Sequence, residues 1–385
     1  MSAPALAGTE NNATTQATVE QIDPRFQHRS RQPGLDLLRA LAIVVVVIYH
    51  TGIFGFALPY DFHRFGWVGV DLFFVLSGYL IGGQLLSQLR RHNQIRFGRF
   101  YARRALRILP AYLVIVAVYF SLPVLREFPA ISPLWKFLIS VQNIGLRGGT
   151  AFSHAWSLAI EDQFYLLLPF VLLVLSRSRR AALGAPFAIF LGGLLLRGIL
   201  AHQLPNGSGG VSYRGYQFWI YYPTWTRLDP LVFGVALAAI ERYRASWWST
   251  LTGLAPWLLA PAVALVALGL YMGDSDVLTI KTCIWQLPLI AFGMAALLVC
   301  AVSPRLPFCR VHVPGAAFLA SVAFSVYLSH KLVIHSIIQL CHRCSLSLTS
   351  FWALLLIESA VYVAGAALFF AVERPFLHLR NRVAA

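Results

Sequence analysis

The sequence carries little charge: only 12% of its 385 residues are Asp, Glu, Lys or Arg, about half the share of an ordinary soluble domain. Apolar residues make up 58% of the chain. A water-soluble fold of this size could not cover so much apolar surface. The composition therefore disfavours a single soluble core and favours lipid as the solvent.

Acidic residues are scarcer still, since 15 of them stand against 31 basic residues, for a formal charge of +16. In a soluble protein this balance would suggest a nucleic-acid partner. The sequence has no motif of a nucleic-acid-binding domain, and we expect no such partner. In a membrane protein the basic residues instead indicate which side of the bilayer each loop occupies.

Cysteine is also scarce. The five cysteines are scattered along the chain and form no disulfide framework. Cys341 and Cys344 are spaced like half of a zinc site, but no second pair exists. A local disulfide or two free thiols is therefore favoured, and we expect no metal. Residues 1–33 lack the basic start and apolar core of a signal peptide, and their polar composition predicts a disordered tail.

Long apolar runs recur through the rest of the chain and predict an all-α, polytopic membrane bundle. The expected organisation is a cytoplasmic tail (1–33), a transmembrane domain (34–376) and a short cytoplasmic tail (377–385). An even number of spans places both termini on one side, and the loops of that side hold most of the Lys and Arg, which predicts cytoplasmic termini. The ten predicted spans are 35–53, 67–88, 108–125, 156–175, 182–202, 225–241, 251–272, 281–302, 315–340 and 351–372.

The first span contains two basic side chains, Arg39 near its cytoplasmic end and His50 near its outer end. They are eleven positions apart, which places both on one face of a helix and separates them by roughly 16 Å. A long ligand beside this helix could meet an arginine at one end and an imidazole at the other. Alternatively, Arg39 reaches out to lipid headgroups and His50 forms hydrogen bonds at the membrane interface.

The loop after the second span is rich in arginine, from Arg90 to Arg107. These residues could set the topology and contact anionic lipid. They could equally hold a phosphate-rich cytosolic ligand with forked guanidinium groups. Charge alone does not separate the two interpretations.

Further ionisable residues lie inside the predicted spans, where they usually face the bundle interior and mark function. Asp71 lies at the depth of His50 and could orient its imidazole or hold an acceptor. Lys331 could instead reach outward to the interface. The other residues of this kind are Glu161 in the fourth span, Arg227 and Asp229 at the mouth of the sixth, and His330 in the ninth.

The order of these residues resembles the bacterial acyltransferase-3 family over about residues 33–376. The match rests on Arg39-x10-His50, Gly69-Val70-Asp71 through Ser77-Gly78-Tyr79, Arg103-Arg104-x2-Arg107-Ile108-Leu109-Pro110, Trp156-Ser157-Leu158-x2-Glu161-x3-Tyr165, Arg227-Leu228-Asp229, and Tyr327-Leu328-Ser329-His330.

The resemblance implies an O-acyltransferase of the bacterial inner membrane that uses acetyl-CoA or another acyl-CoA from the cytoplasm. The implied acceptor is a sugar hydroxyl of a surface polysaccharide, a lipopolysaccharide or a lipid-linked precursor. By the family pattern, His50 is the catalytic histidine, Arg39 is its paired arginine, and Arg104 with Arg107 is the cytoplasmic Arg-x-x-Arg. We expect all three arginines to bind the donor. Many relatives carry a C-terminal esterase-like domain, and here we expect the form without it.

The resulting hypothesis has neutral His50 remove the proton of the acceptor hydroxyl, whose oxygen then attacks the thioester. Asp71 or Glu161 would fix the imidazole tautomer, and an acyl-histidine intermediate is the alternative route. Two other functions stay open: acylation of a small hydrophobic acceptor such as a macrolide or lipid, and transport without transfer. Residues expected to support the acceptor or the site are Ser77, Trp156, Tyr165, Arg227, Asp229, His330 and Lys331.

Overall fold

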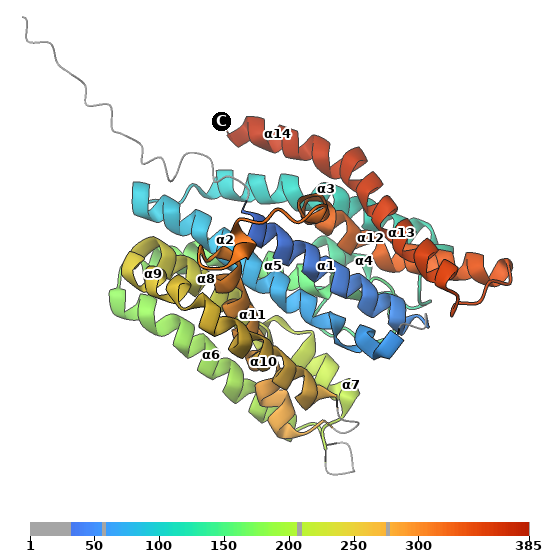
Figure 1. Ribbon diagram of the computed structural model, residues 1–385, viewed down its shortest axis with the longest axis horizontal. Coiled ribbons are helices and arrows are strands. Elements are labelled where there is room, and N and C mark those ends of the chain that lie inside the picture. Colours follow the sequence, from blue (N-terminus) through green and yellow to red (C-terminus); the bar gives the residue numbers. More distant parts are fainter. Residues whose placement is uncertain (1–31, 56–58, 206–209, 275–277, 385) are drawn as a thin grey trace, which may run out of the picture. The chain divides into compact units, whose positions relative to one another are not determined.

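The structure, a computed structural model, describes residues 32–55, 59–205, 210–274 and 278–384. Apolar runs form its helices, because a backbone surrounded by lipid must satisfy its own hydrogen bonds. The described residues form isolated bridges but no strand. The main helices (Figure 1) are α1 (Pro33–Ile53), α2 (Gly69–His92), α3 (Phe97–Ser121), α5 (Trp156–Leu175), α6 (Arg179–His202), α8 (Asp229–Tyr243), α10 (Ala255–Gly273), α11 (Ile280–Val302), α12 (Ala316–Arg343), α13 (Phe351–Leu368) and α14 (Arg374–Ala384).

Nine helical segments in this described part are long and apolar enough to cross a membrane. They confirm the predicted all-helical, polytopic architecture, and they correspond to every predicted span except 225–241. The predicted N-terminal tail lies, up to residue 31, outside the described residues. The predicted C-terminal tail, 377–385, continues helix α14 as far as Ala384. Cys341 and Cys344 are free thiols.

The structure differs from the sequence prediction at the sixth span. Helix α8 has 15 residues and is about 22 Å long, whereas a full crossing needs about 20 residues. The outer part of this passage consists of short turns: α7 (Tyr213–Tyr216), the π-helical turn η5 (Gln217–Tyr221) and the 3-10 turn η6 (Thr224–Thr226).

Helices α2 and α8 lie side by side because each has a glycine where the other backbone approaches. A Cβ atom on Gly78 would lie 2.0 Å from the carbonyl oxygen of Leu231, and one on Gly234 would lie 2.2 Å from that of Val75. This close packing fixes the position of α8 along α2, and with it the position of the turns that precede α8.

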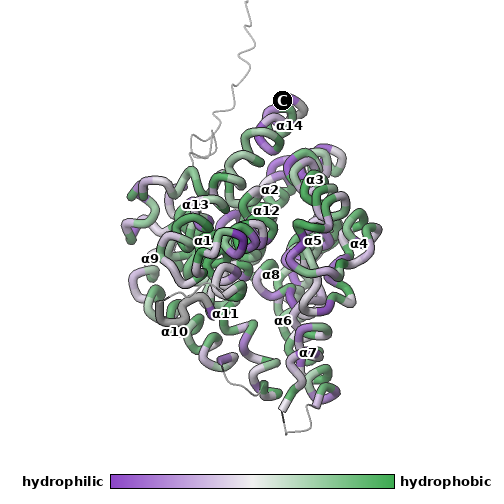
Figure 2. The backbone as a smooth tube through the Cα atoms, turned by 90° about the vertical axis from the view of Figure 1, so that its right-hand side faces the viewer, coloured by the Kyte–Doolittle hydropathy of each residue, from purple (hydrophilic) through white to green (hydrophobic). Residues whose placement is uncertain are grey.

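Large apolar side chains are exposed on the outer helices, including Phe187 on α6 and Trp257 on α10. In water such a surface would cause aggregation, whereas in a bilayer it is solvated by lipid. Figure 2 shows hydrophobic residues along most of the helical tube, with hydrophilic stretches on α14 and near α3. The surface therefore fits a multi-pass membrane protein.

The beginning of α1 and the C-terminal helix α14 lie at the same end of the bundle. Arg39 of α1, Arg107 of α3 and Arg380 of α14 all line one cavity. This placement fits an even number of crossings, in which the turns before α8 and α8 itself together complete one passage. We refer to this arginine-rich end as the inner end and to the opposite end as the outer end.

Candidate active site

Two cavities enter the bundle from opposite ends and share a border. The outer cavity has a volume of about 420 Å³ and is lined by His50. The inner cavity, of about 340 Å³, is lined by Arg39. Val70 of α2 and Tyr327 of α12 line both cavities. Arg39 and His50, which were predicted to share one face of α1, thus line two different cavities, and these cavities share a border.

The hydroxyl of Tyr327 forms two hydrogen bonds at this border. The hydroxyl of Tyr327 lies 2.6 Å from Oγ of Ser157 and donates to the carbonyl oxygen of His154 at 2.7 Å. It joins α12 to the beginning of α5. A molecule that extends from one cavity into the other must pass beside it.

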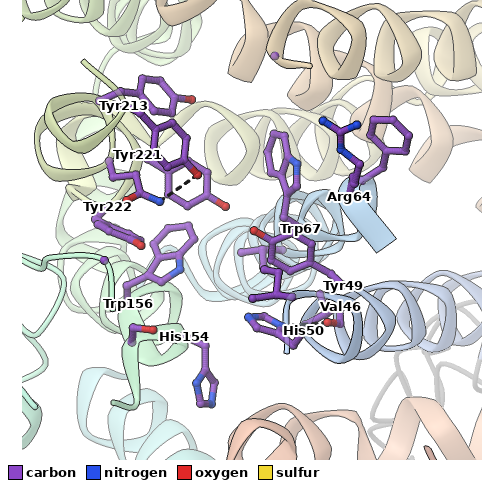
Figure 3. A pocket seen from close by; sticks show the side chains of 18 of the residues that line it. Val46, Tyr49, His50, Arg64, Trp67, His154, Trp156, Tyr213, Tyr221 and Tyr222 are labelled. Carbon is purple, nitrogen blue, oxygen red and sulfur yellow. Dashed lines mark hydrogen bonds between the residues drawn. The ribbon is translucent and has the colours of Figure 1, made fainter. Parts of the chain in front are cut away.

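Three histidine rings cluster at the inner boundary of the outer cavity. The Nδ1 atom of His50 lies 3.2 Å from Nε2 of His330, and the ring centroids of His154 and His330 are 4.7 Å apart. His154 and His330 are buried, whereas His50 is half-buried. His50 and His154 line the cavity (Figure 3). Of the three, only His50 and His330 were expected from the sequence.

His154 was missed because it lies in the short turn η4 (Ser153–Ala155), ahead of the helix that contains the recognisable motif. Its Nε2 atom lies 3.3 Å from the carbonyl oxygen of Leu328, and its Nδ1 atom is buried without a hydrogen-bond partner in the described structure. The available signal was a histidine two positions before Trp156, at the polar opening of a span.

Aromatic side chains form much of the wall of the outer cavity. Figure 3 shows Trp156, Tyr221 and Tyr222 on one side of the cavity, with Trp67 and Tyr49 facing them from the other. Trp156 and Tyr221 have ring centroids 5.0 Å apart. Such a wall offers flat apolar faces together with hydroxyl and indole donors, as ligand sites for amphipathic molecules do.

Asp71 does not orient His50 in the structure. Its carboxylate instead pairs with the guanidinium of Arg227 at 3.1 Å, and both side chains are buried. The Arg227 guanidinium also lies 4.9 Å from the ring centroid of Tyr221 and 5.4 Å from that of Trp156. This ion pair therefore packs against two aromatic side chains of the cavity wall, Tyr221 and Trp156.

A second buried pair joins Arg197 of α6 to Asp229 of α8 at 2.7 Å. Arg197 also donates to the carbonyl oxygen of Thr226 at 2.8 Å. Asp229, which was expected at the mouth of a span, therefore lies inside the bundle and fixes the beginning of α8 against α6.

Lys331 does not reach outward to the interface. Its ammonium group lies 3.0 Å from the carboxylate of Glu127 and donates to Oγ of Ser153 at 3.0 Å. Only 4% of Lys331 is exposed, although the residue lines the outer cavity. Because the charge is paired, this residue ties α12 to the segment after α3 and to η4.

The inner cavity is rich in arginine. Arg104 and Arg107 of α3 line it together with Arg39. Arg107 lies 3.8 Å from the buried carboxylate of Glu373, and Arg39 lies 3.3 Å from that of Asp36. The structure thus brings together the three arginines that were expected to bind the donor.

Glu161 faces this inner cavity and not the imidazole of His50. It accepts a hydrogen bond from the hydroxyl of Tyr165 at 3.1 Å, and that hydroxyl also contacts Oγ of Ser77. Within the described residues, neither Glu161 nor Asp71 forms a hydrogen bond with His50. Glu161, Tyr165 and Ser77 are therefore brought together, but as a polar patch among the arginines.

The chain is similar to proteins of known name. A family model described as an acyltransferase domain matches residues 32–372. The chain is 32% identical over 228 residues to peptidoglycan O-acetyltransferase OatA of Listeria monocytogenes, an alignment that covers 55% of this chain and 34% of that protein. It is 34% identical over 224 residues to O-acetyltransferase OatA of Staphylococcus aureus, covering 54% and 34%. The chain thus matches about a third of the length of these relatives, and no solved structure matches it significantly.

Proposed function

The chain belongs to the acyltransferase-3 family, and from this premise we propose that it is an O-acyltransferase that moves an acetyl group from acetyl-CoA to a hydroxyl of a cell-envelope carbohydrate. The observation that carries the proposal is the pair of cavities that meet at Val70 and Tyr327. One offers arginines to an anionic donor, and the other offers a histidine and aromatic faces to an acceptor.

The donor enters the inner cavity. Coenzyme A carries its phosphates at one end and its thioester at the other. Arg104 and Arg107 hold the phosphates, because guanidinium groups bind phosphate oxygens in pairs. The pantetheine arm then extends past Arg39 toward the border with the outer cavity, where the thioester reaches His50.

His50 acts as the general base. Its imidazole takes the proton of the acceptor hydroxyl while the oxygen attacks the thioester carbonyl. The new carbon–oxygen bond forms, the carbon–sulfur bond breaks, and the departing thiolate takes the proton back from the imidazolium. Transfer through an acyl-histidine is the competing route, and rapid quenching of the enzyme with labelled acetyl-CoA would trap it as label bound to the protein.

The acceptor occupies the outer cavity. A sugar ring has an apolar face of C–H groups and a rim of hydroxyls, which suits the aromatic and hydroxyl-bearing wall formed by Trp67, Trp156, Tyr221 and Tyr222. The relatives named as peptidoglycan O-acetyltransferases support a cell-wall glycan as the acceptor. A macrolide or a lipid is the alternative occupant, and an acceptor series decides between these classes.

The enzyme lies in the bacterial inner membrane, with the inner end of the bundle and both termini in the cytoplasm. The concentration of arginines at that end supports this orientation, because cytoplasmic loops are enriched in Lys and Arg. Acetyl-CoA is a cytoplasmic metabolite, so the inner cavity opens toward the donor. Labelling of single cysteines introduced at Arg126 and Arg177, in loops at opposite ends of the bundle, tests this topology.

The deciding experiment measures release of free coenzyme A from acetyl-CoA by the protein in nanodiscs, with muropeptide or oligosaccharide acceptors present. We expect release by the wild type and by His335→Ala, a histidine of α12 that lines neither cavity, and none by His50→Ala. Release by folded His50→Ala at the wild-type rate would remove His50 from the chemistry. Uptake of labelled substrate into liposomes without loss of the acyl group would indicate a transporter instead.

A further inference from the structure

The His330 ring is completely buried behind His50 and forms a short hydrogen-bond chain with it. Nδ1 of His330 lies 2.7 Å from the carbonyl oxygen of Tyr327, and Nε2 of His330 lies 3.2 Å from Nδ1 of His50. Nδ1 of His50 also lies 2.9 Å from the carbonyl oxygen of Val46. Each of these three hydrogen bonds therefore joins a ring nitrogen either to a carbonyl oxygen or to another ring nitrogen.

When both rings are neutral, these contacts determine their tautomers. A carbonyl oxygen only accepts hydrogen bonds, so the ring nitrogen facing it must carry the hydrogen. His330 is therefore protonated at Nδ1, which leaves a lone pair on Nε2. His50 is likewise protonated at Nδ1, and this hydrogen is shared between the oxygen of Val46 and Nε2 of His330. The opposite tautomers would place two acceptors against each other at 2.7 and 2.9 Å.

The same assignment leaves the lone pair of His50 on Nε2. A base must present an unprotonated nitrogen to the hydroxyl that it deprotonates. We infer that His330 is a positioning residue of the transfer reaction, which acts through His50 by accepting the hydrogen bond of Nδ1–H and so holding Nε2 ready as the base. This inference rests on the proposed function, in which His50 is the general base.

The arrangement also suits the charge that develops during the reaction. When Nε2 of His50 takes the hydroxyl proton, the ring becomes an imidazolium, and hydrogen bonds donated by a charged group are about twice as strong as neutral ones. The lone pair of His330 already faces the Nδ1–H group, so no rearrangement is needed at that moment. The neighbouring ammonium of Lys331 is paired with Glu127. The proton remains on His50 until the thiolate of coenzyme A takes it back.

Two substitutions separate a role of His330 as a hydrogen-bond acceptor from a role in filling buried space. His330→Leu fills the space but removes the acceptor, whereas His330→Gln places an amide oxygen where Nε2 lies. His335→Leu, on the same helix and away from both cavities, is the matched control. Each variant is assayed in nanodiscs for coenzyme A release, with kcat and KM for acetyl-CoA measured separately.

We expect His330→Leu to lower kcat by about 100-fold or more, because removing the orienting partner of a catalytic histidine costs factors of this order. The KM for acetyl-CoA should change by less than about twofold, since His330 touches neither cavity. The kcat of His330→Gln should be at least about tenfold higher than that of His330→Leu. A kcat of His330→Leu equal to that of His335→Leu would overturn the inference.

Nitrogen NMR of the wild type observes the tautomers directly, without relying on a change in activity. With ¹⁵N-labelled histidine, protonated and unprotonated ring nitrogens have distinct shifts, and the His50→Ala and His330→Gln spectra assign the two rings. We expect Nδ1 protonated and Nε2 unprotonated in both. A protonated Nε2 on His330 would exclude the acceptor role. An inactive His50→Ala beside a fully active His330→Leu would refute this inference alone, whereas an active His50→Ala would refute the proposed function as well.

Discussion

The buried pair of Asp71 and Arg227 leads to a quantitative prediction. The two charges lie 3.1 Å apart, with side-chain exposures of 0% and 1%. At an effective dielectric constant of about 20, their attraction is about 5 kcal/mol. Removing one partner of such a pair leaves the other charge buried without compensation, which typically costs about 3–5 kcal/mol. We therefore expect Asp71→Asn, which keeps the volume and removes the charge, to lower the free energy of unfolding by about this amount.

The pair also predicts what happens when both charges are removed. A buried pair replaced by uncharged residues of similar volume is often neutral in stability. The double variant Asp71→Asn with Arg227→Met should therefore recover at least about half of the loss seen in the single variant. Arg227→Met also loses the contacts of the guanidinium with Tyr221 and Trp156, so recovery should remain incomplete.

The assay is thermal unfolding in detergent, followed by size-exclusion chromatography of the fraction that remains monodisperse. The matched control is Asp274→Asn, because Asp274 pairs with Arg64 at 2.9 Å with both side chains substantially exposed. Such a pair contributes at most about 1 kcal/mol. If Asp71→Asn unfolds at the same temperature as Asp274→Asn, the structural role is refuted. If it is as stable as the wild type but has lost kcat, Asp71 has the catalytic role that the sequence suggested.

Two further predictions concern the donor site and the packing of α8. Arg104→Gln should raise the KM for acetyl-CoA about tenfold with little change in kcat, because it removes a phosphate contact remote from the thioester; an unchanged KM would place the phosphates elsewhere. Gly234→Ala should destabilise the protein by about 3 kcal/mol, because its Cβ would lie 2.2 Å from the carbonyl oxygen of Val75. Gly184→Ala, with no atom within 4 Å of the added carbon, is the control, and equal melting temperatures would contradict the close approach of α2 and α8.

The helices were largely predictable because lipid imposes one rule on every segment that crosses it. A backbone without water must form its own hydrogen bonds, so each long apolar run becomes a helix whatever its neighbours are. The rule does not apply where protein replaces lipid around a segment. The passage that ends in α8 is such a case, because its outer part is irregular and contacts α6 and α2 through Arg197 and Arg227. No hydropathy pattern within 211–228 indicates those partners.

The candidate site was predictable mainly where a single helix determines the geometry. The spacing of Arg39 and His50 on α1 places them along one face, and the structure gives each its own cavity. Among partners from different helices, the arginines of α1 and α3 share a cavity as expected, but the carboxylates expected beside His50 lie elsewhere. Asp71 was expected beside His50 because the two share a depth, but depth does not specify direction around the helix axis, and the carboxylate points to Arg227.

The buried polar residues and the aromatic wall of the outer cavity depend on each other. A wall made of short turns exposes Tyr221 and Tyr222 to the cavity, but it leaves backbone carbonyls that no regular helix satisfies. Side chains satisfy them: Asn143 donates to the carbonyl oxygen of Tyr222 at 3.2 Å, and the hydroxyl of Thr226 donates to that of Ile220 at 2.7 Å. Arg197 donates to the carbonyl oxygen of Thr226 itself. In lipid these carbonyls would each cost several kcal/mol, so the polar residues that interrupt the apolar runs are what allow the irregular wall of the outer cavity to form.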